Sequence, residues 1–298
     1  MPVHTEHSKG LLLAVAGGLT LTFDIPLIRL GDGEAWSILL LRTATTLAAT
    51  LVMWAAWRAM TPTVPRLIPG KRGFLVALLY GLGSITFITG VYNTTTANLV
   101  FILAFNTMFA ALLSWLFLRE RPRPATFAAM AAMIVGVGII VGDSIGSGHL
   151  LGDLMALSSA FLIASAITIS RASGEDMGFT SLIGVVPPFL VAAFMVAQTG
   201  FNVSAPWWIV FNGAVIMPIS FFCLAAAPRH LSGPEVAMFY LLETVLAPVW
   251  VWMIFSEVPT RNSLIGGAIL IVALVAHSLW QLHQGRRRRA ALAVRHPA

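Results

Sequence analysis

Three charged residues lie inside long apolar stretches of the chain: Asp24, Arg42 and Glu243. If these stretches cross a bilayer, each charge is costly there and becomes a candidate functional group. Asp24 and Arg42 are expected at similar depth on neighbouring helices, so they could neutralise one another. Alternatively, one of them could bind the charged head group of a zwitterion. Both are therefore candidates for a charge-balancing or gating role.

Glu243 lies in the middle of its apolar run. The constant offset that superposes Thr107 on Thr244 also places Asn106 opposite Glu243. Three interpretations stay open for this carboxyl group. It could be protonated and hydrogen-bonded to Asn106, it could bind the ammonium group of a substrate, or it could carry a coupled proton.

Aromatic and amide residues recur on several of the apolar runs at spacings that fit the lining of a cavity. A cavity for a small amphipathic molecule is mainly apolar with a few placed polar groups. Helix packing and lipid contact explain any single residue equally well, but the set as a whole favours a cavity. The candidate substrate-binding residues are Tyr80, Asn98, Phe101, Phe105, Asn106, Phe161, Phe239, Tyr240 and Glu243.

Prolines inside the apolar runs indicate where the helices could bend. A proline removes one backbone hydrogen-bond donor and can kink a helix. Carriers use bent or broken helices to open the two sides of the membrane in turn. The candidate hinge residues are Pro26, Pro187, Pro218 and Pro248.

Motifs of the common enzyme classes are missing from the sequence. It contains no His-Glu-x-x-His, no Gly-x-Ser-x-Gly and no Gly-x-x-x-x-Gly-Lys-Ser/Thr. The single cysteine, Cys223, lies inside an apolar run, so neither a disulfide framework nor a cysteine metal cluster is expected. We expect no enzyme activity, no catalytic residues, no metal and no cofactor.

The composition places these residues in membrane-spanning helices. The chain is 58% hydrophobic and only 10% charged, whereas soluble domains contain about 25% charged residues. A run of about 20 apolar residues is long enough to cross the hydrocarbon core. The sequence therefore predicts an all-α integral membrane protein with ten spans, at 9–28, 36–57, 73–92, 97–117, 125–142, 150–170, 179–197, 207–227, 235–255 and 263–283.

The basic residues predict the orientation of these spans. If both termini are cytoplasmic, the cytoplasmic loops and termini hold every Lys and Arg except Arg29, Arg42 and Arg261. Such a bias is the positive-inside pattern, and it predicts a multi-pass protein of the bacterial cytoplasmic (inner) membrane. The bilayer is then a partner, and nucleic acid is excluded because it requires a basic soluble surface.

A few other polar residues have simpler interpretations. Lys9, Asp153 and Glu257 lie at predicted helix ends, where solvation at the membrane interface would explain them. His277, in the last run, is interpreted as a lone, satisfied polar residue.

An internal repeat relates residues 97–142 to 234–279. It superposes Glu120 on Glu257, so each copy contains an apolar run, a Glu-x-Pro turn and a second apolar run. A weaker match aligns Arg29 with Arg171. Because five predicted helices separate the copies, the two halves are inverted in the membrane. We predict a first five-helix repeat at 1–145, a second, inverted repeat at 146–285 and a basic cytoplasmic tail at 286–298.

With ten helices, two inverted halves, Arg42 early in the second helix and a Glu-x-Pro turn after the fourth and ninth, the chain resembles the drug/metabolite transporter superfamily. It is most similar to the EamA-type exporters, which include bacterial aromatic amino-acid exporters of the YddG type. The resemblance implies a central cavity lined by helices 1, 3, 4, 6, 8 and 9, with helices 5 and 10 at the periphery. It also implies export of small metabolites.

The sequence thus predicts a secondary transporter that exports small amphipathic metabolites by alternating access. Aromatic and other neutral amino acids are the leading substrates. The alternatives are another metabolite or drug (a nucleobase, a sugar derivative or a cation) and, less favoured, a channel. A channel needs no inverted repeat and would show a continuous polar lining, whereas these helices are largely apolar. No obligatory protein partner is inferred.

Overall fold

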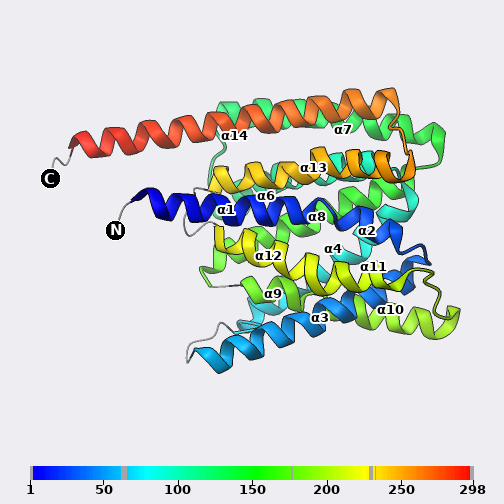
Figure 1. The fold of residues 1–298 in the computed structure, drawn as a ribbon. Coiled ribbons are helices and arrows are strands. Elements are labelled where there is room, and N and C mark those ends of the chain that lie inside the picture. The colour runs from blue at the N-terminus through cyan, green and yellow to red at the C-terminus, as the bar shows by residue number, and fades with distance from the viewer. Residues whose placement is uncertain (1–2, 62–65, 176, 228–230, 232, 296–298) are drawn as a thin grey trace.

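The computed structural model describes residues 3–61, 66–175, 177–227, 231 and 233–295 as a bundle of helices (Figure 1). Ten segments of this described chain are long and apolar enough to cross a membrane, which confirms the predicted all-α fold with ten spans. The helices are α1 (Val3–Leu21), α2 (Asp24–Leu30), α3 (Ala35–Met60), α4 (Gly70–Asn93), α5 (Thr96–Leu103), α6 (Asn106–Leu118), α7 (Pro124–Ser147), α8 (Leu150–Ser173), α9 (Gly178–Ile183), α10 (Val186–Thr199), α11 (Pro206–Phe211), the π-helical segment η1 (Asn212–Ile216), α12 (Met217–Ala226), α13 (Gly233–Phe255) and α14 (Arg261–Arg295).

The two ends of the bundle are distinguished by the chain termini. α1 begins and α14 ends at the same end (Figure 1), which we call the near end. The opposite end, at which α2 ends and α5, α8 and α11 begin, is called the far end.

Four of the ten spans are interrupted within the bundle. An interruption leaves backbone groups without their regular helical partners, and inside a membrane these need other hydrogen bonds. Thr22, for example, donates both its backbone N–H and its hydroxyl to the carbonyl of Leu19. The interruptions lie at residues 22–23, 104–105 and 184–185 and at the π-helical segment 212–216.

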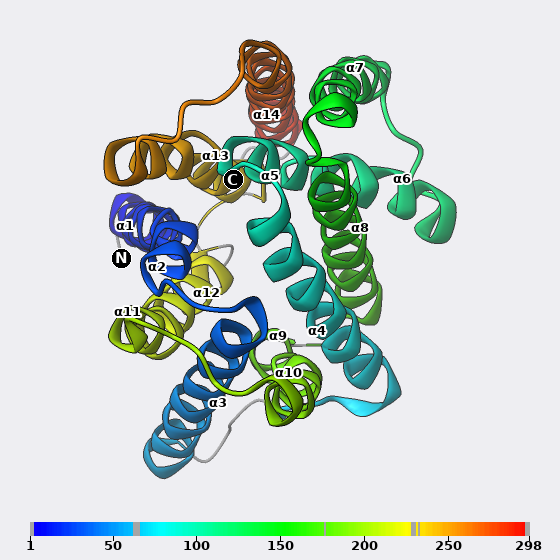
Figure 2. The same cartoon turned by 90° about the vertical axis from the view of Figure 1, so that its right-hand side faces the viewer.

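The closest helix pairs join the first half of the chain to the second. α4 packs along α8, α1 along α12, α3 along α10 and α7 along α14 (Figure 2). α7 and α14 approach closely because glycines meet at their crossing. A Cβ atom added to Gly136 would lie 2.8 Å from the carbonyl oxygen of Gly266, so only a residue without a side chain fits.

The apolar core is continuous toward the far end and divided toward the near end. One large cluster joins both halves through buried residues of α2, α4, α5, α11 and α13, among them Ile28, Ile88, Leu99, Ile209 and Val251. Two smaller clusters lie apart from it. One joins α1 to α12 through Ala14 and Leu224, and the other joins α4 to α8 through Val76 and Ala166.

Candidate functional site

A buried charge triad occupies the interior where α2, α3 and η1 meet. Arg42 Nη2 donates to both carboxylate oxygens of Asp24, at 3.0 and 2.9 Å, and Arg42 Nε donates to Asn212 Oδ1 at 3.0 Å. Asn212 Nδ2 completes the triangle by donating to Asp24 Oδ1 at 2.7 Å. The three side chains satisfy one another, and such pairing is what makes a buried charge tolerable.

Asn212 is a member of this triad that the sequence reasoning missed. The signal was present, because Asn212 is an amide inside an apolar run and lies six residues before Pro218. Its position depends on the π-helical segment that begins with it. Gly213 allows this segment to approach α3 closely, since a Cβ atom there would lie 2.5 Å from the carbonyl oxygen of Arg42.

Glu243 differs from the triad because it has no neutralising partner. It is half-buried on α13, and it makes no hydrogen bond or ion pair with any residue in the described part of the chain. It is nevertheless near the triad, because the charges of Asp24 and Arg42 both act on it. A half-buried carboxyl group without an ion-pair partner is a suitable group for binding a cation or an ammonium.

Tyr240 lies close to Glu243, and Tyr80 lies close to Tyr240. Tyr240, one turn earlier on α13, interacts electrostatically with both Glu243 and Tyr80 of α4. Tyr240 is 44% exposed although its neighbours belong to the interior of the bundle. Asn106, at the start of α6, is half-buried, and its side chain has no hydrogen-bond partner among the described residues. Tyr80, Tyr240 and Glu243 therefore form the centre of the candidate site, with Asn106 as a further unpaired polar group.

Three phenylalanines form a chain of edge-to-face contacts between α6 and α8. The ring centroids of Phe105 and Phe109 are 5.1 Å apart, and those of Phe109 and Phe161 are 5.4 Å apart. Phe105 is buried, whereas Phe161 is 45% exposed. Such pairs favour a defined ring orientation, and Phe161 is the member with surface available to another molecule.

Asn98, Phe101 and Phe239 are engaged by neighbouring helices. The Asn98 amide donates to Ser144 of α7 at 3.1 Å and accepts a short hydrogen bond from Ser263 of α14. Phe101 packs directly against Gly267 of α14, and Phe239 packs against Gly18 of α1. In this conformation these three side chains connect helices, so we do not place them in the candidate site.

The predicted hinge prolines match the interruptions only in part. Pro187 lies at the start of α10, directly after the 184–185 break, and Pro218 directly follows η1. Pro26 lies one turn beyond the 22–23 break. α13, in contrast, continues through Pro248, and the 104–105 break contains no proline.

His277 lies on the peripheral α14, as expected from the sequence. Its Nε2 is 2.8 Å from the Gln281 amide nitrogen, and its ring stacks on Trp280. Nδ1 is buried without a partner among the described residues, so only one of the two ring nitrogens has a hydrogen-bond partner.

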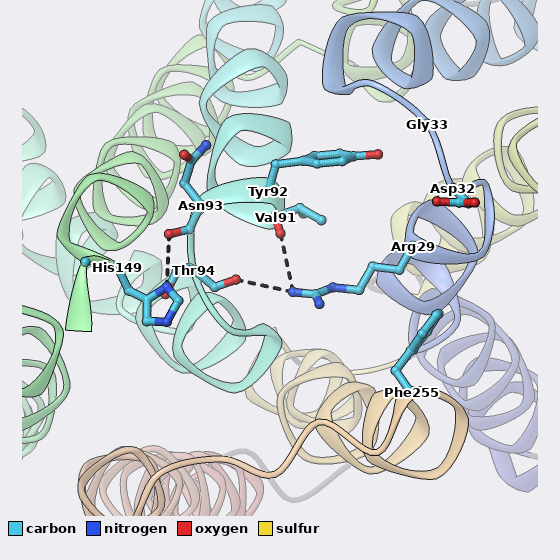
Figure 3. Close-up of a pocket in the computed structure, with 10 residues that line it drawn as sticks. Arg29, Asp32, Gly33, Val91, Tyr92, Asn93, Thr94, His149 and Phe255 are labelled. Atoms are coloured by element: carbon cyan, nitrogen blue, oxygen red, sulfur yellow. Dashed lines mark hydrogen bonds between the residues drawn. The ribbon is translucent and has the colours of Figure 1, made fainter. Parts of the chain in front are cut away.

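A cavity of about 540 Å³ lies at the far end, outside the contacts of Arg29 that close this end (Figure 3). Its lining combines charged, polar and aromatic side chains, among them Asp32, Tyr92, His149 and Phe255. Arg29 extends across it toward α4, where Nη2 donates to the carbonyl oxygens of Val91 and Thr94 at 3.3 and 3.2 Å (Figure 3).

The Arg29 guanidinium also closes this end through an ion pair. Arg29 Nη1 donates to Glu257 Oε2 at 2.5 Å, and the other carboxylate oxygen of Glu257 accepts from the backbone N–H of Thr96 at 2.7 Å. Asp153 extends the network, because its carboxylate accepts from the Thr94 hydroxyl at 2.6 Å.

Interface solvation, which the sequence suggested for Asp153 and Glu257, is therefore not their main environment. Asp153 is fully buried, and its Oδ2 has no partner among the described residues. Glu257 binds an arginine and the first N–H of a helix, where a negative charge is stabilised by the helix dipole. Sequence reasoning missed this because the partners lie on distant segments.

Comparison with known proteins agrees with this architecture. Residues 8–142 match the EamA-like transporter family. The chain is 25% identical over 278 residues to the pseudopaline exporter CntI of Pseudomonas aeruginosa, which covers 91% of this chain and 96% of that protein. It is 28% identical over 244 residues to solute carrier family 35 member G1 of Homo sapiens, covering 72% and 66% of the two chains.

Two further matches extend this picture. A riboflavin transporter of Vibrio cholerae is 23% identical over 186 residues, covering 61% of this chain and 62% of that protein. One chain in a solved crystal structure superposes with a TM-score of 0.65 at 16% identity, over 92% of this chain and 98% of the other, which shows a shared fold.

Together the fold and these matches define a multi-pass membrane transporter. Residues 8–142 match an EamA-like domain, and most of the chain is similar to transporters of the drug/metabolite transporter superfamily.

Proposed function

We propose that this transporter is a secondary carrier that exports small amphipathic metabolites from the cytoplasm by alternating access, with neutral and aromatic amino acids as the leading cargo. The near end faces the cytoplasm in this proposal, because the loops at that end hold most of the basic residues.

The observation that carries the cargo assignment is the unpaired carboxylate of Glu243. Asp24 and Arg42 neutralise one another, whereas Glu243 is half-buried, has no ion-pair partner among the described residues and interacts electrostatically with Tyr240. An ammonium group would supply its missing charge, and aromatic rings such as Phe161 would bind an apolar side chain.

The arrangement of the helices supports two inverted halves at 1–145 and 146–285. Exchanging the halves converts the α4–α8 pair into the α12–α1 pair, and both pairs are closely packed. The α3–α10 and α7–α14 pairs convert into themselves. A carrier needs such halves because each can close one side of a central site.

Counterflow in proteoliposomes tests this proposal. Vesicles are loaded in turn with unlabelled phenylalanine, threonine or methionine, and uptake of the labelled compound is followed. Accelerated uptake that saturates supports the carrier, and Glu243→Gln should strongly reduce it because the carboxylate charge is lost. A conductance that does not saturate would indicate a channel and contradict the proposal.

The names of the relatives provide the second candidate cargo. CntI is a pseudopaline exporter, and the Vibrio protein is a riboflavin transporter. Counterflow of pseudopaline or riboflavin, in the same folded protein that moves none of the three amino acids, would replace the amino-acid assignment and retain the carrier.

A further inference from the structure

The two Glu-x-Pro turns have the same local backbone. The residue directly before each glutamate is in the left-handed region, with φ 59° at Arg119 and φ 56° at Ser256. Positive φ is uncommon for residues other than glycine. Glu120 and Glu257 therefore leave equivalent helix ends, α6 at the near end and α13 at the far end.

The arginines that bind these glutamates are also equivalent in local structure. Arg29 lies in the last turn of α2, and Arg171 lies in the last turn of α8. Three residues after each arginine the chain enters the left-handed region, with φ 43° at Asp32 and φ 68° at Gly174. Each arginine binds the glutamate at its own end, as Arg29–Glu257 at the far end and Arg171–Glu120 at the near end.

The environments of the two pairs nevertheless differ. At the far end the N–O distance is 2.5 Å and the side chains are only 23% and 20% exposed. At the near end the distance is 3.3 Å and the side chains are 55% and 54% exposed. The far-end pair is thus packed and direct, and the near-end pair is loose and solvated.

Both ion pairs join the two halves, but only the far-end glutamate also binds the start of a helix. Glu257 follows α13 of the second half, and it binds Arg29 and the first turn of α5, both in the first half. Arg171 additionally donates to Ser114 of α6, so it holds α8 against α6 and the turn that follows it. The counterpart of the Glu257–α5 contact would join Glu120 to the first turn of α13.

We propose that Arg29–Glu257 and Arg171–Glu120 belong to two equivalent gates, and that each gate closes its end when its glutamate also binds the start of a helix of the other half. This structure is the state with the far end closed and the near end open. In the opposite state Glu120 binds the start of α13 and the far-end pair separates. The core at the near end fits this assignment, because the α1–α12 and α4–α8 clusters are separate among the residues that the structure describes.

The proposal rests on the carrier function and identifies the residues that control access to its central site. Neither gate depends on which compound is carried. A measurement of the two ends without substrate therefore separates a wrong gate assignment from a wrong cargo.

The test measures spin-label distances across each end in purified protein, in a Cys223→Ser background. One pair of labels spans the far end at exposed positions, Asn93→Cys on α4 and Trp207→Cys on α11. The other spans the near end with Leu12→Cys on α1 and Ala172→Cys on α8. Each label pair is measured in the parent and in the gate variants.

Glu257→Gln should lengthen the far-end distance and shorten the near-end distance, because it removes the ion pair that stabilises the state with the far end closed. The matched variant Glu120→Gln should leave both distances unchanged and slow counterflow, since its contact is needed only in the opposite state. The combined substitution Arg29→Glu with Glu257→Arg should restore most of the short far-end distance.

Two results would overturn the proposal. One is an unchanged far-end distance in Glu257→Gln protein that elutes as a folded monodisperse species. The other is an equal shift of both label pairs in Glu120→Gln. If Glu257→Gln does not fold, the milder Glu257→Asp and Arg29→Lys variants decide the question, and they should give a smaller shift in the same direction.

Discussion

The two ends of this transporter use the same residue types on the same local backbone, and only one end is closed. At the far end an arginine, a glutamate and a helix start meet above a continuous apolar core. At the near end the equivalent arginine and glutamate are more than half exposed, and the α1–α12 and α4–α8 clusters are separate among the described residues. The comparison shows that the residue types of a gate do not decide whether it is closed. Packing around the ion pair decides how much the pair contributes to the stability of the closed state.

Energetics support this difference. An exposed ion pair contributes roughly 0–1 kcal/mol, because solvent screens the charges and two long side chains are ordered. Hydrogen bonds to charged groups contribute roughly 1.5–3 kcal/mol. The far-end pair has two such bonds at Glu257, and the near-end pair has one long bond between exposed groups.

The largest loss of stability is expected at the buried triad. The triad belongs to neither end, so it provides a reference value for a fully buried ion pair. Arg42→Leu leaves the Asp24 carboxylate buried without its counter-charge and should lower the free energy of unfolding by about 3–5 kcal/mol. Chemical unfolding in detergent measures this loss. Adding Asp24→Asn should recover most of it, and a double variant as unstable as the single one would contradict the charge argument. Arg171→Leu is the matched exposed control.

Glu257→Gln sharpens the comparison at the closed end. The substitution keeps the shape of the side chain and removes the charge that Arg29 and the start of α5 both bind. The free energy of unfolding should fall by about 1.5–3 kcal/mol. High salt should lower the stability of the parent protein by much less than this, because a pair shielded from solvent is only weakly screened. A loss no larger than that of Glu120→Gln would break the comparison.

Thr94→Val tests the hydrogen bond between Thr94 and Asp153 at the closed end. The Thr94 hydroxyl donates to Asp153, which is fully buried. Losing this donor leaves the carboxylate without its observed partner, at a cost of about 1–3 kcal/mol. Asp153→Asn on the Thr94→Val background should restore stability by removing the buried charge. Thermal unfolding midpoints of the single and double variants measure both effects, and additive losses would contradict the pairing.

The smallest effect on stability is expected at the open end. Glu120→Gln should change the free energy of unfolding by at most about 1 kcal/mol, because both partners are mostly exposed. The same variant should slow counterflow, since the near-end gate acts during the transport cycle. A variant that is both as stable and as active as the parent would remove Glu120 from the gate.

The sequence predicted the elements of this fold because composition decides which segments enter a membrane. All ten spans follow from apolar length, and the Asp24–Arg42 contact was one of two interpretations of charges at similar depth. The position of each Glu-x-Pro turn was also evident, since a proline and a charge end an apolar helix at the interface.

The direction of individual side chains could not be predicted in the same way. These spans are apolar on every face, so no amphipathic pattern indicates which side of a helix faces the interior. Asn98 and Phe101 accordingly turned out to contact α7 and α14, and the break between α5 and α6 occurs without a proline.

The sequence by itself determined the membrane class, the ten spans and the matched arginines and glutamates of the two ends. Only the tertiary structure decided that Asn212 completes the charge triad, that Glu243 has no neutralising partner among the described residues and that the far end is the closed one. The physical reason is that the two ends have nearly the same local chemistry. The choice between two such states depends on small differences in packing summed over helices that are distant in sequence.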